Sequence, residues 1–482
     1  MKATIACTHP IAQVDDRLYS SFIEHMGRAV YTGIYEPSHP TADKFGFRGD
    51  VSALIRPLRL SHIRYPGGNF LSGYRWRDGI GPKSERPVRP ELAWFAIEPN
   101  EVGTDEFLQW CERLDIRPML GVNLGTGTAQ DALDLLEYVN GTHGTYYADL
   151  RRKNGRAAPY GVKLWCLGNE MDGPWQICTK TAEEYGRIAC ETAKMMKWFD
   201  PSIELVACGS SYRAMPTFGA WEKTVLAHCY PHIDYISLHQ YYTNETDDIP
   251  SFLARSLEME DSIREIGAIC DEARRAQNGS HDVALSFDEW NVWYHFRQSG
   301  LEPPKWTVGR PIEEELFDDV DPLVTGSMMN TLLRNADRVR IACLAQLVNV
   351  IAPIMTEPGG RAWVQTIYEP FRCASLYGRG ISMLPEVTVP SYNCAIRENV
   401  PYLDCATVRN DDGALTFFLV NRNGKERLEA TLHLDRAYSA AHLQTLRGAA
   451  LYPLDCRLCP DHAEFSLPRH SWSMLRLLPE KA

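Results

Sequence analysis

Lys163-Leu164-Trp165-Cys166-Leu167-Gly168-Asn169-Glu170 is an apolar run that ends in an acid, and a turn, 171–174, follows it. A second run of the same kind is Val283-Ala284-Leu285-Ser286-Phe287-Asp288-Glu289. A mostly apolar run that ends in a carboxylate is typical of a buried parallel strand that presents an acid at one edge of a sheet. Two such strands in one domain predict that Glu170 and Glu289 meet at one site. The alternative is that both are ordinary surface acids at strand ends.

Six more strand-like runs alternate with helical patterns along the same part of the chain. In chain order the eight runs span 18–23, 62–65, 118–123, 162–167, 203–207, 235–238, 283–287 and 341–347. Eight strand–helix units in sequence predict an α/β fold of the (β/α)8, or TIM-barrel, type. A doubly wound open sheet is the second possibility, but no Gly-x-Gly-x-x-Gly follows the first strand.

Three of the helices between these runs have recognisable sequence patterns. Thr104 stands as an N-cap before a helix over 105–114. Thr181 and Glu184 have the spacing of a capping box, which predicts a helix that ends near Phe199. The pattern over 325–340 predicts a third, amphipathic helix.

From about residue 370 the pattern changes to short alternating runs separated by turn residues. They span 400–408, 414–420, 428–434, 442–446 and 471–478. Such runs predict an antiparallel, jelly-roll-like β-sandwich. Residues 2–7 are also strand-like, and we expect them to add a strand to the sandwich. The predicted domains are therefore a catalytic barrel, 16–370, and a sandwich made of 1–15 and 371–482.

Composition narrows the classes of function. The chain has 482 residues, enough for two domains, and a formal net charge of −12. This charge argues against nucleic acid as a partner, because binding to a phosphate backbone needs a basic face; a neutral sugar fits better. No apolar run is long enough for a transmembrane helix, and the first ten residues lack the apolar core of a signal peptide. The 14 cysteines are interpreted as buried thiols of a reduced, cytoplasmic protein.

The carboxyl ends of barrel strands form the active site of this fold class, so the predicted strand ends are informative. They are rich in amides, aromatic rings and carboxylates, a mixture that suits a sugar. The candidates are Glu24, Asn69, Asn123, Asn169, Glu170, Ser210, His239, Tyr241, Glu289, Trp293, Gln346 and Asn349. The turn Pro66-Gly67-Gly68 lets the backbone approach a ligand closely and directs Asn69 inward.

Paired carboxylates are the equipment of glycoside hydrolysis, in which one is a general acid and base and the other a nucleophile or base. His25, His62 and His239 are the candidate metal ligands, but they have no His-x-His spacing and no paired Asp. The sequence therefore predicts no metal and no other cofactor. A histidine near a carboxylate more often orients it by a hydrogen bond.

Several segments, taken together, resemble one known family over nearly the whole chain. They are SFIEHMGR (21–28), RYPGGN (64–69), WCLGNEMDGPW (165–175), YISLHQY (235–241), DEWNVW (288–293) and LAQLVNVIAP (344–353). In this order they resemble the α-L-arabinofuranosidases of glycoside hydrolase family 51. The resemblance implies a (β/α)8 barrel with a C-terminal sandwich, in agreement with the patterns described above.

The resemblance also implies roles for individual residues. Glu170 is expected to be the general acid/base, Glu289 the nucleophile, and Asn169 the residue that holds the sugar 2-hydroxyl. The remaining expected substrate-site residues are Glu24, Asn69, Trp94, His239, Tyr241, Trp293 and Gln346. Members of the family often form hexamers, so a homo-oligomer is expected. The segments 94–100 and 126–128 depart from the family pattern, which leaves leaving-group specificity open.

The expected reaction is a retaining double displacement that releases terminal arabinofuranosyl residues from arabinan, arabinoxylan or their oligosaccharides. For Glu170 to be protonated near neutral pH, apolar neighbours or the charge of Glu289 must raise its pKa. Two alternatives remain open. One is another glycosidase on the same scaffold, such as an endo-glucanase, a β-xylosidase or a galactofuranosidase. The other is a sugar-binding protein without catalysis.

Overall fold

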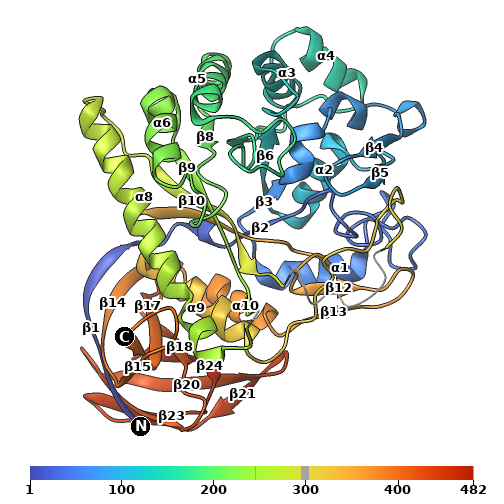
Figure 1. Cartoon of the computed structure of the whole chain (residues 1–482). Coiled ribbons are helices and arrows are strands. Elements are labelled where there is room, and N and C mark those ends of the chain that lie inside the picture. Colours follow the sequence, from blue (N-terminus) through green and yellow to red (C-terminus); the bar gives the residue numbers. More distant parts are fainter. Residues whose placement is uncertain (245, 295–302, 481–482) are drawn as a thin grey trace.

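The structure, a computed structural model, describes residues 1–244, 246–294 and 303–480. It contains a closed eight-stranded barrel and a separate ten-stranded sheet (Figure 1). Both chain ends lie in the sheet unit (Figure 1). Among the described residues, no helix combines the length and apolar character needed to cross a membrane. The domain bounds given above stay a prediction.

The barrel strands follow one another around the ring in chain order, and neighbouring strands are parallel. They are β2 (Ser20–Phe22), β3 (His62–Tyr65), β6 (Arg117–Val122), β7 (Leu164–Leu167), β8 (Glu204–Ala207), β9 (Tyr235–Tyr242), β10 (Ala284–Val292) and β11 (Val339–Leu344). Each of the eight predicted runs overlaps one of these strands. The closed barrel is therefore confirmed, and the open sheet is excluded.

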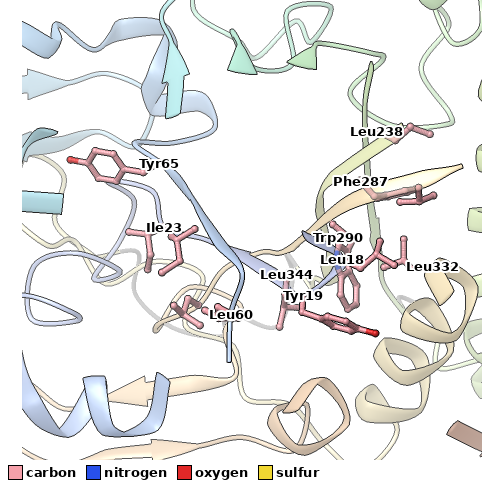
Figure 2. Close-up of a cluster of buried hydrophobic side chains, with 14 of the residues drawn as sticks. Leu18, Tyr19, Ile23, Leu60, Tyr65, Leu238, Phe287, Trp290, Leu332 and Leu344 are labelled. Atoms are coloured by element: carbon pink, nitrogen blue, oxygen red, sulfur yellow. The ribbon is translucent and has the colours of Figure 1, made fainter. Parts of the chain in front are cut away.

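Two apolar layers explain why the barrel strands have nearly continuous apolar sequences. Leu164 and Cys166 of β7 belong to a cluster inside the barrel, whereas Trp165 and Leu167 belong to the large cluster between the strands and the helices. Figure 2 shows part of this outer cluster, where Leu332 of a surrounding helix lies near strand residues. A strand buried on both faces cannot carry a polar face, so it reads as an apolar run.

Helices surround the barrel (Figure 1). They are α1 (Gly49–Ile55), α2 (Thr104–Leu114), α3 (Ala129–Asn140), α4 (Tyr146–Lys153), α5 (Ala182–Phe199), α6 (Ala220–Cys229), α7 (Ile249–Ala254), α8 (Ser256–Ala276), α9 (Asp321–Arg334) and α10 (Tyr368–Tyr377). The capping box of α5 is confirmed, because the Glu184 carboxylate accepts the Thr181 N–H at 2.9 Å and the Thr181 hydroxyl accepts the Glu184 N–H at 3.3 Å. The predicted N-cap of α2 is off by one residue: Gly103 precedes the helix, and its N–H is bound by Glu106.

Short elements complete the loops. The strands are β4 (Arg89–Glu91) with β5 (Ala96–Glu98), β12 (Ile354–Thr356) with β13 (Ala362–Val364), and β15 (Ser391–Tyr392) with β16 (Val400–Pro401). The 3-10 helices are η1 (Asp16–Leu18), η2 (Arg56–Leu58), η3 (Asn69–Gly73), η4 (Trp76–Gly79), η5 (Lys83–Glu85) and η6 (Tyr230–His232).

The second unit is one sheet in the order β21-β20-β24-β18-β17-β14-β1-β19-β23-β22. Its strands are β1 (Lys2–Gln13), β14 (Ile381–Thr388), β17 (Leu403–Arg409), β18 (Leu415–Asn421), β19 (Leu428–His433), β20 (Tyr438–Arg447), β21 (Ala450–Leu454), β22 (Cys456–Leu458), β23 (His462–Leu467) and β24 (Ser471–Pro479). The sheet folds over a core to which both of its halves contribute, and β20 packs near β22. This is the predicted sandwich.

The N-terminal strand is confirmed as part of this sheet, and it is longer and more central than expected. β1 pairs antiparallel with β14 and parallel with β19. The parallel pair is the one departure from an antiparallel sheet among the described strands. The first residues of the chain therefore tie the two halves of the sheet together.

The helix predicted over 325–340 is wrong in its bounds and in its exposure. α9 is buried along its length, from Asp321 to Leu333. It packs on β10 of the barrel and on β14, β17, β18 and β24 of the sheet. Asn330 donates to Asp404 of the sheet at 2.7 Å, and a Cβ on Gly326 would overlap the indole of Trp472. Polar residues that looked solvent-facing instead have partners across the barrel–sheet interface.

Candidate active site

The carboxyl ends of the barrel strands carry Glu170 and Glu289, which reach the site in different ways. Glu170 lies on the turn after β7, with left-handed backbone at Gly168 (φ +89°) and at Glu170 itself (φ +43°). Glu289 lies within β10, just after a shift in strand register. A bulge of this kind changes the direction of neighbouring side chains, and Asp288 and Glu289 both approach Arg64.

Glu289 is buried and held by two donors. Arg64 Nη1 donates to Glu289 Oε1 at 2.5 Å, and the Tyr241 hydroxyl donates to Oε2 at 2.7 Å. A Cβ on Gly68 would lie 3.3 Å from Glu289 Oε1 and 3.1 Å from Glu24 Oε2. The Gly67-Gly68 turn thus lets the backbone approach closely, as predicted, but what it approaches is the pair of acids.

Glu170 has a different environment. Its Oε2 accepts a hydrogen bond from Trp175 Nε1 at 2.7 Å, and its Oε1 lies 3.0 Å from His239 Nδ1. Burial raises the pKa of Glu170 above its ordinary value, and the charge of Glu289 adds to the rise. The hydrogen bonds from His239 and Trp175 oppose it. Glu170 is therefore suited to hold a proton at a pH where an exposed carboxyl group has lost it.

His239 is the cation between the acids. Burial alone would lower its pKa, but Glu289, Asp288 and Glu170 outweigh burial and raise the pKa of His239 to about 10. For Asp288, burial raises the pKa, but Arg64 and His239 outweigh burial and lower it overall. His239 Nε2 lies 3.5 Å from Asp288 Oδ1. Two buried basic side chains, Arg64 and His239, therefore face the buried acids Asp288, Glu289 and Glu170.

The spacing of the two glutamates has a chemical meaning. One oxygen of Glu170, one oxygen of Glu289 and one ring nitrogen of His239 lie within 4.8 Å of one another. Carboxyl groups of retaining glycosidases are about 5–5.5 Å apart, and those of inverting enzymes about 6.5–9.5 Å. The same three groups have the residue types that bind small cations. The absence of a required metal stays a prediction.

Glu24, Trp94 and Gln346 form a second group beside Glu289. Glu24 Oε1 accepts from the backbone N–H of Phe70 and from Trp94 Nε1, both at 2.9 Å. Gln346 Oε1 accepts the Glu24 N–H at 3.0 Å. Burial, and then the charge of Glu289, raise the pKa of Glu24 to about 8. Glu24 can therefore both donate and accept hydrogen bonds near neutral pH.

The remaining predicted residues join the same network. Asn169 Oδ1 accepts from Arg64 Nη2 at 2.6 Å, and Asn169 Nδ2 donates to Asn69 Oδ1 at 3.4 Å. Trp293 meets the edge of the Tyr241 ring at a centroid distance of 5.0 Å. All ten residues expected from the family resemblance therefore lie around one end of the barrel.

Sequence reasoning did not assign three residues of this network: Arg64 and Trp175, which contact the two acids, and Asp288, which contacts Arg64 and His239. Arg64 and Trp175 lie inside quoted segments but were not assigned to the site, and Asp288 directly precedes Glu289. A signal for Arg64 was available, since a charged residue within an apolar strand must be paired when it is buried. No sequence signal distinguishes Trp175 from the other tryptophans, because its contact depends on the turn after β7.

The fold and the site define a glycoside hydrolase with a (β/α)8 catalytic barrel. Residues 54–259 match the "Alpha-L-arabinofuranosidase 1 domain" model and residues 288–452 the "Alpha-L-arabinofuranosidase C-terminal domain" model. The chain is similar to "Intracellular exo-alpha-(1->5)-L-arabinofuranosidase 1" of Bacillus subtilis, with 54% identity over 88% of this chain and 85% of the relative. It is also similar to an "Exo-alpha-(1->6)-L-arabinofuranosidase" of Bifidobacterium longum, with 46% identity over 90% and 86% of the two chains.

A solved family 51 α-L-arabinofuranosidase from Bifidobacterium longum is 43% identical, covers 98% of this chain and 99% of its own, and superimposes with a TM-score of 0.94. The chain belongs to the α-L-arabinofuranosidases of glycoside hydrolase family 51. A bifunctional glucanase-xylanase from a metagenome library has a TM-score of 0.62 at 13% identity over 99% of each chain, so it shares the fold alone. The comparisons therefore do not favour the alternative glycosidase activities.

Proposed function

We propose that this chain is an exo-acting, retaining α-L-arabinofuranosidase that removes terminal non-reducing α-L-arabinofuranosyl units from arabino-oligosaccharides, arabinan or arabinoxylan. The observation that carries the proposal is the short spacing of Glu170 and Glu289: one carboxylate oxygen of each lies within 4.8 Å of the other. This spacing leaves no room for a water molecule behind the sugar, as an inverting enzyme requires.

In the first step, Glu289 Oε attacks the anomeric carbon and forms a glycosyl–enzyme ester. The bond between that carbon and the glycosidic oxygen breaks, and Glu170 gives its proton to the departing oxygen. The raised pKa of Glu170 supports this role, because the group must be protonated before the bond breaks. Arg64 and Tyr241 hold Glu289 in position for the attack.

In the second step, Glu170 is a carboxylate and takes a proton from an incoming water molecule. The hydroxide oxygen bonds to the anomeric carbon, the ester bond to Glu289 breaks, and arabinose leaves with its configuration retained. Glu170 ends the cycle protonated, and Glu289 ends it ionised. Two displacements at one carbon restore the starting stereochemistry.

The other residues of the site bind the sugar. Asn169 and Asn69, which touch each other, supply amide groups next to Glu170 and fit a ring hydroxyl. Glu24 and Gln346 bind hydroxyls from the opposite side, and His239 orients Glu170. Trp94 donates to Glu24 and Trp293 contacts the Tyr241 ring, so both indoles lie beside residues assigned to the sugar. We assign them the rim around one terminal sugar, an arrangement that fits exo action.

Location and assembly extend the proposal. Relatives named as intracellular enzymes support action inside the cell on oligosaccharides. We propose a homo-oligomer, a hexamer by resemblance to the family, and a structural rather than sugar-binding role for the sandwich. The last point is supported by Trp472, the one tryptophan after residue 370, which is buried against α9.

A panel of 4-nitrophenyl glycosides tests the activity. Rapid release of nitrophenol from the α-L-arabinofuranoside, and little from the β-xyloside, β-glucoside or galactofuranoside, is the expected result. NMR during the reaction should show the α-anomer of arabinose first. First appearance of the β-anomer would exclude the retaining mechanism, and preference for another sugar would exclude the substrate assignment. Dialysis against a chelator should leave the rate unchanged.

A further inference from the structure

A short turn between β4 and β5 carries Trp94 to the active site. The two strands pair antiparallel, with Glu91 opposite Ala96, so residues 92–95 connect them as a hairpin turn. From this turn Trp94 Nε1 donates to Glu24 Oε1 at 2.9 Å. The backbone of the turn therefore decides whether the indole reaches Glu24.

Glu91, the last residue of β4, binds the backbone of the turn with both of its carboxylate oxygens. Oε1 accepts the N–H of Ala93 and Oε2 accepts the N–H of Trp94, each at 2.7 Å. Glu91 is 7% exposed, so both hydrogen bonds lie largely out of water. Burial raises the pKa of Glu91 to about 7, and the two N–H groups oppose the rise. Because a buried carboxyl group is costly without such partners, the acid and the turn stabilise each other.

Other contacts hold the rest of the hairpin. At its base, Glu98 Oε2 of β5 lies 2.7 Å from His25 Nδ1. On the carbonyl side of the turn, Arg310 Nη1 donates to the Trp94 carbonyl oxygen at 3.1 Å. These contacts do not involve Glu91, so its loss should loosen the turn around the indole and leave the hairpin folded.

We propose that Glu91 is a positioning residue for the terminal sugar: it fixes the turn that holds the Trp94 indole against Glu24. This inference rests on the proposed function, in which Glu24 binds a hydroxyl of the arabinofuranosyl unit. Glu24 Oε1 is held at 2.9 Å by the Phe70 N–H and by the indole N–H, and a displaced indole would remove the second of these. Glu91 thus acts through other residues, and no step of the reaction passes through it.

The first test uses two substrates that share the terminal sugar and differ in the leaving group. Glu91→Gln keeps the size of the side chain but sets an amide NH2 group against one of the two N–H groups of the turn. We expect kcat/KM to fall roughly 5- to 30-fold, and by a similar factor on an aryl arabinofuranoside and on an arabino-oligosaccharide. The melting temperature should change little.

Binding of a ring without a leaving group gives a second readout. The inhibitor 1,4-dideoxy-1,4-imino-L-arabinitol carries hydroxyl groups on a five-membered ring, and its KI should rise in Glu91→Gln by a factor similar to the fall in kcat/KM. Glu91→Asp keeps two acceptor oxygens, and aspartate readily accepts N–H groups of the residues that follow it in a turn. Both the rates and the KI of Glu91→Asp should therefore stay close to those of the wild type.

A double variant tests the route through the indole. Trp94→Phe removes the N–H that Glu24 accepts and keeps an aromatic ring. If Glu91 acts through this indole, adding Glu91→Gln to Trp94→Phe should lower kcat/KM by less than about twofold further. Losses that multiply would show that Glu91 acts by another route and would overturn the proposal.

The matched control is Asp43→Asn, in the loop before α1. Asp43 Oδ1 also binds a turn, since it accepts the N–H of Phe45 at 2.8 Å and that of Phe47 at 3.0 Å. This variant should leave the rates and the KI unchanged.

The proposal fails if Glu91→Gln is fully active, loses only oligosaccharide cleavage or does not fold. A fall in its melting temperature at unchanged KI would likewise show that Glu91 only supports the hairpin. With an active wild type, each of these results contradicts this inference and leaves the proposed function intact. A wild-type enzyme that cleaves no arabinofuranoside would contradict the proposed function, and the inference with it.

Discussion

Glu170 and Glu289 lie side by side and both face His239, yet their closest hydrogen-bond donors differ. Glu289 belongs to the strand β10, and its two donors come from other barrel strands: Tyr241 from the neighbouring β9, and Arg64 from β3, which is not a neighbour. Glu170 belongs to a turn, and its two donors are His239 inside and Trp175 at the surface. The difference shows that a guanidinium and a phenol hold the carboxylate of Glu289, whereas burial raises the pKa of Glu170.

The two surroundings match the two roles. A nucleophile must keep one geometry, and a strand residue that is hydrogen-bonded to a buried guanidinium has that property. An acid/base must gain and lose a proton in each cycle, and an environment that opposes the charge without forbidding it provides that. Loop attachment also places Glu170 where the leaving group departs. Variants that remove one acid, or one of its hydrogen-bond donors, test this comparison.

Glu289→Ala should have the largest effect. Without a nucleophile no glycosyl–enzyme ester forms, so activity should fall by roughly 10⁴–10⁶-fold on an aryl arabinofuranoside and on an arabino-oligosaccharide alike. Steady-state rates on both substrates measure this. If azide restores activity, the product should be the β-glycosyl azide, because azide takes the place of Glu289 and attacks the anomeric carbon in a single displacement. Ready cleavage of either substrate by the unsupplemented variant would place the nucleophile elsewhere.

Glu170→Ala should affect the two substrates unequally. A nitrophenolate leaves without a proton, but a sugar alkoxide does not, so cleavage of the oligosaccharide should fall by roughly 10²–10⁴-fold and glycosylation by the aryl substrate far less. The second step lacks its base, so the ester should accumulate and be visible by mass spectrometry. Added azide should speed turnover and give the α-glycosyl azide. Equal losses on both substrates without azide rescue would mean that the two roles are reversed.

Much of this comparison was predictable from the sequence. The eight barrel strands appear as apolar runs because both of their faces are buried, and each acid stands out at the end of such a run. The resemblance to the family supplied the expected roles. Asp288 was not predictable, because strand alternation would direct it away from Glu289 and only the irregularity in β10 brings both to Arg64.

The sequence was less informative where exposure is mixed. β14 alternates irregularly between buried and exposed residues, and β21 and β22 lie at the edges of the sheet, so none of the three carries a clear apolar pattern. The prediction of α9 was wrong for the opposite reason. Its polar residues are buried and hydrogen-bonded across an interface that the sequence does not reveal. Tertiary contacts, not local propensity, decide these elements.

His239→Gln should have a smaller and more specific effect. The imidazolium favours the carboxylate form of Glu170, so its removal lets burial and Glu289 raise the pKa of Glu170 further. Activity requires protonated Glu170, and the alkaline limb of the pH dependence of kcat/KM should therefore move to higher pH. The rate at the optimum should fall by roughly 10- to 100-fold, the effect of one charge-assisted hydrogen bond.

The control for this variant is His228→Gln, which removes a surface histidine that pairs with Glu183 on α5. Its pH profile should match that of the wild type. An alkaline limb that stays in place or moves to lower pH in His239→Gln would show that His239 does not act on the proton of Glu170.

Trp175→Phe should have the smallest effect, and its direction can be derived in the same way. The indole N–H is a neutral donor to Glu170 Oε2, and it is the weakest of the influences that favour the carboxylate form. Its loss should raise the pKa of Glu170 less than loss of the imidazolium does. The alkaline limb should shift slightly upward, and the rate on an aryl arabinofuranoside should change by roughly 2- to 10-fold. An alkaline limb that stays in place, or moves to lower pH, would show that the indole N–H does not act on the proton of Glu170.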